Sequence, residues 1–158
     1  MKNTQENNTI NEGPSADVRL SEHFRLSEMT RSATAIRRRI DNTPQDYHIE
    51  SLQDLCEKLL EPIRARFGVV RITSGFRSVE LNEAIGGSKT SQHLYGEAAD
   101  IHAGSLEVAR KMFYYIRDNL EFDQMILEMK RGRVHCLHVS YRTYAPNRRR
   151  VIPYYHMK

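Results

Sequence analysis

The sequence predicts a single α+β domain in which a small antiparallel sheet packs against helices. Its 158 residues suit one domain. Two segments, 52–67 and 106–120, repeat apolar residues at three-and-four spacing, which predicts helices, and short β-branched runs occur at irregular intervals. This irregular order favours α+β over an alternating, doubly wound sheet. The mean hydropathy of −0.64, with no long apolar run, predicts that no segment spans a membrane.

Three parts of the chain differ in composition. Residues 1–19 are polar and aperiodic, which predicts a flexible leader without a core of its own. Residues 20–141 hold the periodic elements and form the expected folded domain, with short helical pieces between 20 and 40. Residues 142–158 contain five basic side chains and no acidic one, so we expect a solvated basic tail there.

The helix over 52–67 has the clearest pattern. Ser51 followed by Asp54 resembles a capping box, and Gly68 is a typical helix end. Pro62 lies inside the pattern and should kink the helix, because proline lacks an amide hydrogen and crowds the preceding turn. The apolar stripe consists of Leu52, Leu55, Cys56, Leu59, Leu60, Ile63 and Phe67.

The remaining elements follow in order. A strand is expected over 69–73, then a helix over 78–85 and a flexible Gly86-Gly87-Ser88 loop. A second strand over 98–103 precedes the helix over 106–120, for which Ser105 is a suitable N-cap. Strands over 125–129 and 134–141 flank a turn-like tetrad at 130–133, which predicts a hairpin.

Charge and cysteine content exclude several functions. The net charge of +4 comes from the C-terminal residues and the body is formally neutral, so we expect no nucleic-acid partner. Cys56 and Cys136 are too few for a disulfide scaffold and lack metal-finger spacing.

The first 20 residues contain no apolar stretch of signal-peptide length, which predicts synthesis in the cytoplasm. We expect the protein to be a monomer.

Histidines and one aspartate are the candidate metal ligands. Four of the seven histidines lie between 93 and 138, and Asp100 stands in an apolar strand, where a carboxylate needs a partner or a cation. Two histidines and one carboxylate are a well-known ligand set for catalytic zinc, which keeps one position for water. His93, Asp100 and His138 supply that set, and His102 is an alternative to His93 because it shares a strand face with Asp100.

Three segments together resemble the D-alanyl-D-alanine carboxypeptidase and dipeptidase family of zinc peptidases. They are SGFRS at 74–78, GGSKTSQHLYGEAAD at 86–100 and LHVSY at 137–141, in the order found in that family. The family includes phage endolysin peptidases and shares its fold with Hedgehog signalling domains. The resemblance implies that His93, Asp100 and His138 bind Zn²⁺, and that Arg77 holds a substrate carboxylate or the oxyanion formed at the scissile carbonyl.

The general base has two candidates. Several members of the family place a glutamate three residues before the last zinc histidine, and this position is His135 here. Imidazole suits the role because it titrates near neutrality, but His135 and His138 would face opposite sides of a regular strand, so a bulge is required. Glu128 ends a segment, 122–128, that also resembles the family, and it is the other candidate.

The resemblance implies a zinc peptidase that hydrolyses an amide bond in peptidoglycan stem peptides, next to a D-amino acid, through metal-activated water. A D,D-carboxypeptidase or endopeptidase is expected, acting on the cell wall after lysis or non-classical export. The substitution at His135 keeps a second interpretation open, a noncatalytic metal-containing module of the same fold that binds cell-wall peptide.

Overall fold

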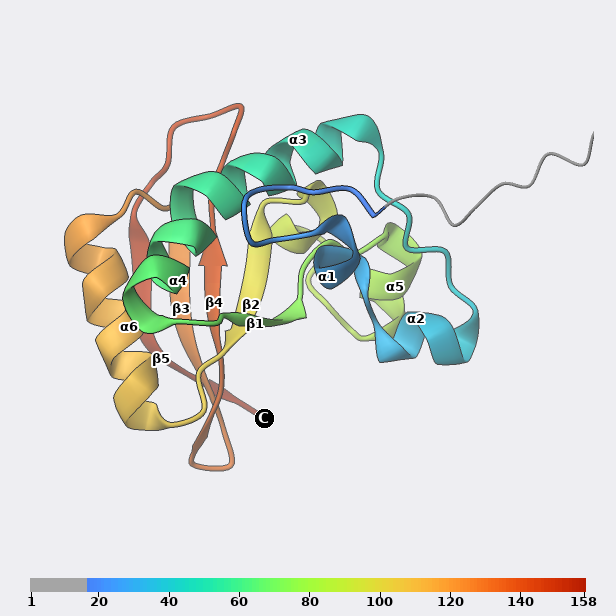
Figure 1. Ribbon diagram of the computed structural model, residues 1–158. Coiled ribbons are helices and arrows are strands. Elements are labelled where there is room, and N and C mark those ends of the chain that lie inside the picture. The colour runs from blue at the N-terminus through green and yellow to red at the C-terminus, as the bar shows by residue number, and fades with distance from the viewer. Residues whose placement is uncertain (1–16) are drawn as a thin grey trace, which may run out of the picture.

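A computed structural model describes residues 17–158 and shows one α+β domain built around a five-stranded sheet (Figure 1). The strand order is β1-β2-β4-β3-β5, and neighbours are antiparallel except for β3 and β5, which run parallel. The expected α+β class with a largely antiparallel sheet is therefore confirmed. Most of the predicted leader, residues 1–16, lies outside the described residues. Over 17–158, none of the helices is both long enough and apolar enough to cross a bilayer.

The strands and helices alternate irregularly along the chain. The strands are β1 (Arg71–Ser74), β2 (Ala98–His102), β3 (Gln124–Lys130), β4 (Arg133–Ser140) and β5 (Arg150–Met157). The helices are α1 (Leu26–Thr30), α2 (Ala33–Arg38), α3 (Asp46–Leu55), a π-helical turn η1 (Cys56–Leu60), α4 (Glu61–Phe67), α5 (Val79–Ala84), a 3-10 turn η2 (Gln92–Tyr95) and α6 (Leu106–Asn119).

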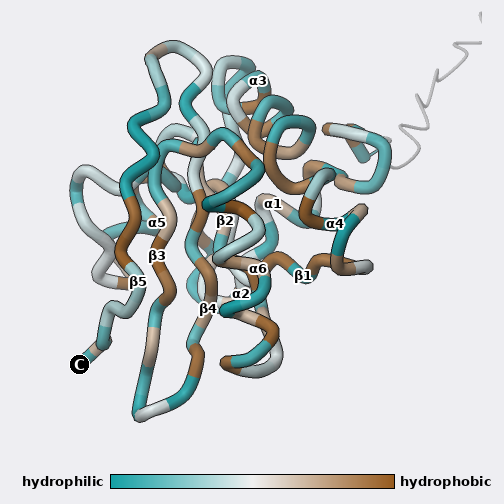
Figure 2. The backbone as a smooth tube through the Cα atoms, turned by 90° about the vertical axis from the view of Figure 1, so that its left-hand side faces the viewer, coloured by the Kyte–Doolittle hydropathy of each residue, from teal (hydrophilic) through white to brown (hydrophobic). Residues whose placement is uncertain are grey.

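The two faces of the sheet have different chemistry, because side chains alternate along each strand. One face points into the hydrophobic core, which α3, α4 and α6 cover (Figure 1). Strand residues on this face include Ala99, Ile101, Met125, Leu127, Leu137 and Val139, all fully or almost fully buried. The register pairs Asp100 with His138 and Glu128 with Cys136 on the opposite face. In Figure 2, β3 changes from hydrophobic to hydrophilic toward its turn with β4.

The helix predicted over 52–67 is confirmed but begins earlier. It starts at Asp46, so Ser51 is a buried residue inside the helix and not its cap. The expected kink at Pro62 takes the form of the π-helical turn η1, in which the amide of Glu61 donates to the carbonyl of Cys56. The wider turn relieves the crowding that proline would cause in the preceding α-helical turn. Gly68 ends the helix with a positive φ of 85°.

The other predicted elements agree with the structure to within two residues or so. Ser78 and Ser105 cap α5 and α6, accepting hydrogen bonds of 3.2 Å from the amides of Leu81 and Val108. The β3–β4 hairpin turns at 131–132 as the tetrad predicted. The Gly-Gly-Ser loop is held in place, because its Ser88 carbonyl accepts a 2.9 Å hydrogen bond from Asn82 Nδ2.

The C-terminal residues differ from the expectation of a solvated tail. Residues 150–157 form β5, which pairs with β3 along the edge of the sheet. Arg148, just before this strand, donates two side-chain hydrogen bonds, of 2.8 and 3.0 Å, to Asp123, a carboxylate with no exposed surface. A buried carboxylate requires a charged partner, and the basic run supplies it. The composition of this segment therefore reflects a role in packing.

Candidate metal centre

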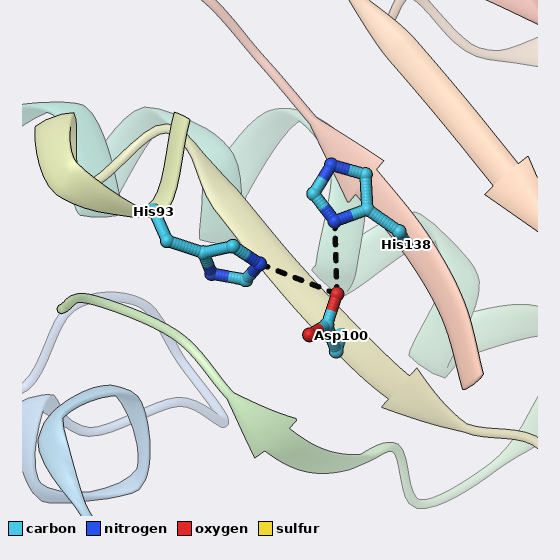
Figure 3. Close-up of side chains that lie close together, drawn as sticks. All are labelled: His93, Asp100 and His138. Atoms are coloured by element: carbon cyan, nitrogen blue, oxygen red, sulfur yellow. Dashed lines mark hydrogen bonds and ion pairs between the residues drawn. The ribbon is translucent and has the colours of Figure 1, made fainter. Parts of the chain in front are cut away.

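Three separate elements bring His93, Asp100 and His138 together (Figure 3). His93 lies in η2, Asp100 in the middle of β2 and His138 directly opposite it in β4. The Oδ1 atom of Asp100 is 3.3 Å from Nε2 of His93 and 2.9 Å from Nδ1 of His138. All three side chains are buried. Their donor atoms lie within 4.8 Å of one another, so they converge on a common point.

The local structure around His93 orients its ring. Ser91 caps the 3-10 turn by accepting a hydrogen bond from the amide of His93. The Nδ1 atom of His93 donates to the carbonyl oxygen of Gly75 at 2.6 Å, and this contact points Nε2 toward Asp100. Such a carbonyl partner is typical of metal-binding histidines, because it fixes the tautomer. No pattern in the sequence indicated that the backbone carbonyl of Gly75 would orient this ring.

Gly96 makes this turn possible. Its φ of 71° is in the left-handed region, and an added Cβ would lie 2.6 Å from the carbonyl oxygen of His48 in α3. Glycine alone combines this backbone conformation with so close an approach. The spacing between His93 and Asp100 thus reflects a turn that is packed directly on a helix and then enters β2.

The electrostatics of Asp100 fit a cation site. Burial raises the pKa of its carboxyl, but His93 and His138 lower it by more, so the net pKa is below the usual value. Asp100 is therefore ionised. Two nitrogens and one carboxylate oxygen, all buried and convergent, match the donor set that zinc uses in catalytic sites. The residues present thus fit a zinc ion on their own chemistry.

Arg77 borders the centre and is held rigidly. Its Nη2 atom is 3.5 Å from Oδ2 of Asp100, while Nε donates to Ser74 Oγ at 3.0 Å and Nη1 to Asn82 Oδ1 at 3.2 Å. Burial lowers the pKa of the guanidinium, and the Asp100 carboxylate opposes this effect. Asn82 was not predicted from the sequence. It is tied to the glycine loop, since a Cβ on Gly87 would lie 2.1 Å from Asn82 Oδ1.

A bulge in β4 brings the two candidate bases together. Glu128 pairs with Cys136 and Met129 with Val134, so His135 is an extra residue without a partner in β3. This is the irregularity that the odd spacing from His138 required. His135 is exposed, and one of its ring nitrogens lies within 4.8 Å of donor atoms of Glu128 and Cys136.

The thiol of Cys136 donates to Glu128 Oε2 at 3.1 Å. Burial raises the pKa of this thiol, and the neighbouring carboxylates of Asp100 and Glu128 raise it further. The thiol is therefore protonated and can act as a hydrogen-bond donor. The spacing of the two cysteines in the sequence gave no indication of this contact.

An open groove of about 950 Å³ reaches the centre. Its lining includes Arg77, Asp100 and His135, and it extends along β1 toward α1 and α2, where Arg31 and Arg71 contribute further positive charge. His102, the alternative ligand, is exposed and does not belong to the cluster of His93, Asp100 and His138. It pairs with Arg71 near the end of β2 instead.

A buried set of two histidines and one carboxylate beside an open groove is typical of zinc hydrolases. The model of the Peptidase M15 family matches residues 22–137, well over half of the chain, and the protein belongs to this family. The matched range includes His93 and Asp100 and ends one residue before His138.

A shorter stretch is similar to a characterised enzyme. Over 36 residues the chain is 50% identical to the zinc D-Ala-D-Ala carboxypeptidase of Streptomyces albus G. This stretch is 23% of the present chain and 14% of that enzyme, so the chain covers only a small part of the curated relative it matches.

Proposed function

We propose that this protein is a zinc-dependent peptidase that hydrolyses an amide bond in bacterial peptidoglycan peptides, next to a D-amino acid. The observation that carries the proposal is the convergence of His93, Asp100 and His138 on one point in a chain of the Peptidase M15 family. Arg77 and an open groove adjoin this point. The carboxypeptidase named above supports a substrate with D-alanine.

The proposed ligands are His93 through Nε2, Asp100 through a carboxylate oxygen and His138 through Nδ1. A bound zinc ion supplies Lewis-acid polarisation of the scissile carbonyl and lowers the pKa of water toward about 7. Gly75 holds the ring of His93 through its carbonyl oxygen. Ionised Asp100 offsets part of the positive charge of Arg77, 3.5 Å away.

Arg77 is proposed to bind the negative charge of the substrate. Ser74 and Asn82 occupy its Nε and Nη1 hydrogens, so the guanidinium plane has a defined orientation before substrate arrives. Such preorganised donors stabilise an oxyanion or a terminal carboxylate without reorganisation at the moment of reaction.

His135 or Glu128 is proposed to take up the proton from the attacking water. His135 is exposed to the groove and turned by the bulge, and this favours it slightly. Glu128 is partly buried, and its Oε2 atom already accepts a hydrogen bond from the Cys136 thiol. The variants His135→Ala and Glu128→Ala separate the two roles, because only loss of the true base should remove the bulk of turnover, by about 10²-fold to 10⁴-fold.

The decisive experiment combines metal analysis with mass spectrometry of peptidoglycan fragments. We expect native protein to hold a zinc ion at His93, Asp100 and His138 and to release cleaved stem peptides, and we expect His93→Ala to lose the ion at this centre and the cleavage. His102→Ala is the matched control, since it removes an exposed histidine outside the cluster and should retain both. Cleavage by metal-free protein at the native rate would refute the proposal.

The second candidate function is a binding module that has lost turnover. The observation that favours it is the histidine at position 135, where the family resemblance leads us to expect a glutamate. Protein that holds zinc at His93, Asp100 and His138, binds muropeptides and cleaves none of them would establish this function. Any zinc-dependent cleavage abolished by His93→Ala would exclude it.

A further inference from the structure

We propose that Glu128, His135 and Cys136 form a second Zn²⁺ site, next to the first centre but sharing no ligand with it. The three side chains supply one carboxylate oxygen, one imidazole nitrogen and one sulfur, and these atoms lie within 4.8 Å of one another. The first centre contains only nitrogen and oxygen donors. The second set is therefore chemically distinct.

The spacing is close to what zinc requires. Zinc bonds of about 2.0–2.2 Å to nitrogen or oxygen and about 2.3 Å to sulfur place tetrahedral ligands about 3.3–3.6 Å apart. Cys136 Sγ is already 3.1 Å from Glu128 Oε2. Only the ring of His135 has to approach further, and because its side chain is exposed it can rotate without disturbing the core.

Strand pairing positions two of these ligands, and the bulge in β4 positions the third. Glu128 and Cys136 are direct cross-strand neighbours in β3 and β4, so their separation is fixed by the sheet. The bulge adds His135 beside Cys136 without a partner in β3. Cys136 is buried and His135 faces the groove, which leaves a solvent-facing position for a fourth ligand such as water.

The donor types select the ion. A thiolate together with an imidazole favours zinc over Mg²⁺ or Ca²⁺, which prefer oxygen ligands. On binding, the zinc ion replaces the thiol hydrogen of Cys136, and the proton leaves to solvent. The hydrogen bond from Cys136 to Glu128 is exchanged for two metal bonds. Cys136 and His138 are two residues apart, so the two sites lie about 7 Å apart along β4.

Occupation of this site would inhibit hydrolysis, an effect that rests on the proposed function. A metal bound to Glu128 and His135 occupies both candidate bases at once, so neither can accept a proton. The first equivalent of zinc would therefore activate the protein and an excess would inhibit it. Cys136 serves here as the residue that makes the site selective for a thiophilic ion.

Titration of the metal-stripped full chain with Co²⁺, followed by absorption spectroscopy, tests the site directly. We expect a second bound equivalent and, with it, a thiolate-to-cobalt charge-transfer band in the near ultraviolet. Cys136→Ser should lose the band and the second equivalent. Cys56→Ser, which removes the other buried cysteine, in η1, should keep both. Mg²⁺ in excess should not displace the second ion.

His135→Ala keeps the test decisive if the cysteine variant does not fold, because His135 is exposed. We expect this variant to bind the second equivalent at least tenfold more weakly. Binding of a single equivalent without a sulfur band, or a band that persists in Cys136→Ser, would overturn the proposal. If the protein binds two equivalents of Co²⁺ and shows the thiolate-to-cobalt band but never cleaves peptide, the second metal site stands and only the proposed hydrolysis is refuted.

Discussion

Replacing Gly96 by alanine tests whether the turn between the two proposed ligands His93 and Asp100 is held by its contact with α3. Gly104 provides a matched control, because both glycines have a φ of 71° but a Cβ on Gly104 would meet nothing within 4 Å. Both substitutions therefore incur the same cost of a left-handed alanine, about 1–2 kcal/mol. Only Gly96→Ala adds a steric contact.

The size of the added effect follows from the geometry. The new Cβ would lie 2.6 Å from the carbonyl oxygen of His48 and 3.2 Å from the side chain of Leu52, against ordinary contacts of 3.4–4 Å. The carbonyl belongs to the backbone of a helix and cannot rotate away. Forcing extra volume into such a site costs about 1–3 kcal/mol. We therefore expect Gly96→Ala to be less stable than Gly104→Ala by this amount.

Thermal and urea unfolding of the two variants measure the difference. For a domain of this size, about 1–3 kcal/mol corresponds to a difference in melting temperature of roughly 2–12 °C. Because the turn also positions His93, zinc affinity should fall in Gly96→Ala and stay near native in Gly104→Ala. Equal melting temperatures and equal zinc affinities in the two variants would refute the reasoning.

Two further predictions concern charged side chains. Burial raises the pKa of Asp123, but hydrogen bonds from Arg148 and Gln92 lower it by more, so the folded pKa is depressed. The ion pair therefore stabilises the protein above the unfolded pKa of about 3.9 and loses this effect as pH falls through the lower folded pKa. Asp123→Asn should lower the free energy of unfolding, measured with urea at pH 7, by about 1–3 kcal/mol. The difference in unfolding free energy between this variant and native protein should become smaller below pH 4. A difference that does not depend on pH would contradict this assignment. Arg77→Lys keeps the charge but loses the planar fork that Ser74 and Asn82 orient, so we expect kcat/KM for muropeptide cleavage to drop by about 10²-fold while zinc content is unchanged. Native kcat/KM in Arg77→Lys would show that the guanidinium has no part in the reaction.

Local sequence was sufficient for most elements. The stripe from Leu52 to Phe67, the serine caps at Ser78 and Ser105 and the turn at 130–133 depend on neighbours a few residues apart, and the structure confirms them. The start of α3 at Asp46 was missed, because its cap is Gln45 with His48, an unusual pair for a capping box.

The candidate site could be predicted only in part from the sequence, and the tertiary structure supplied the rest. The residue types of His93, Asp100 and His138 could be chosen from the sequence, since a buried carboxylate among histidines has few stable partners. The sequence could not decide which histidine completes the set, because His93 and His102 are both close to Asp100 in the chain. The 3-10 turn and its packing on α3 place His93 in the cluster and leave His102 exposed.

Long-range pairing decided the rest. The bulge at His135 depends on the register between β3 and β4. The contact of Cys136 with Glu128 joins residues 8 positions apart, and the ion pair of Arg148 with Asp123 joins residues 25 positions apart. Sequence by itself determined most element types, because these follow from local backbone preference and apolar spacing, but it did not predict the strand β5. Only the tertiary structure decided which polar groups meet, because a side chain's partners across a sheet depend on register, and register is set by the packing of the whole core.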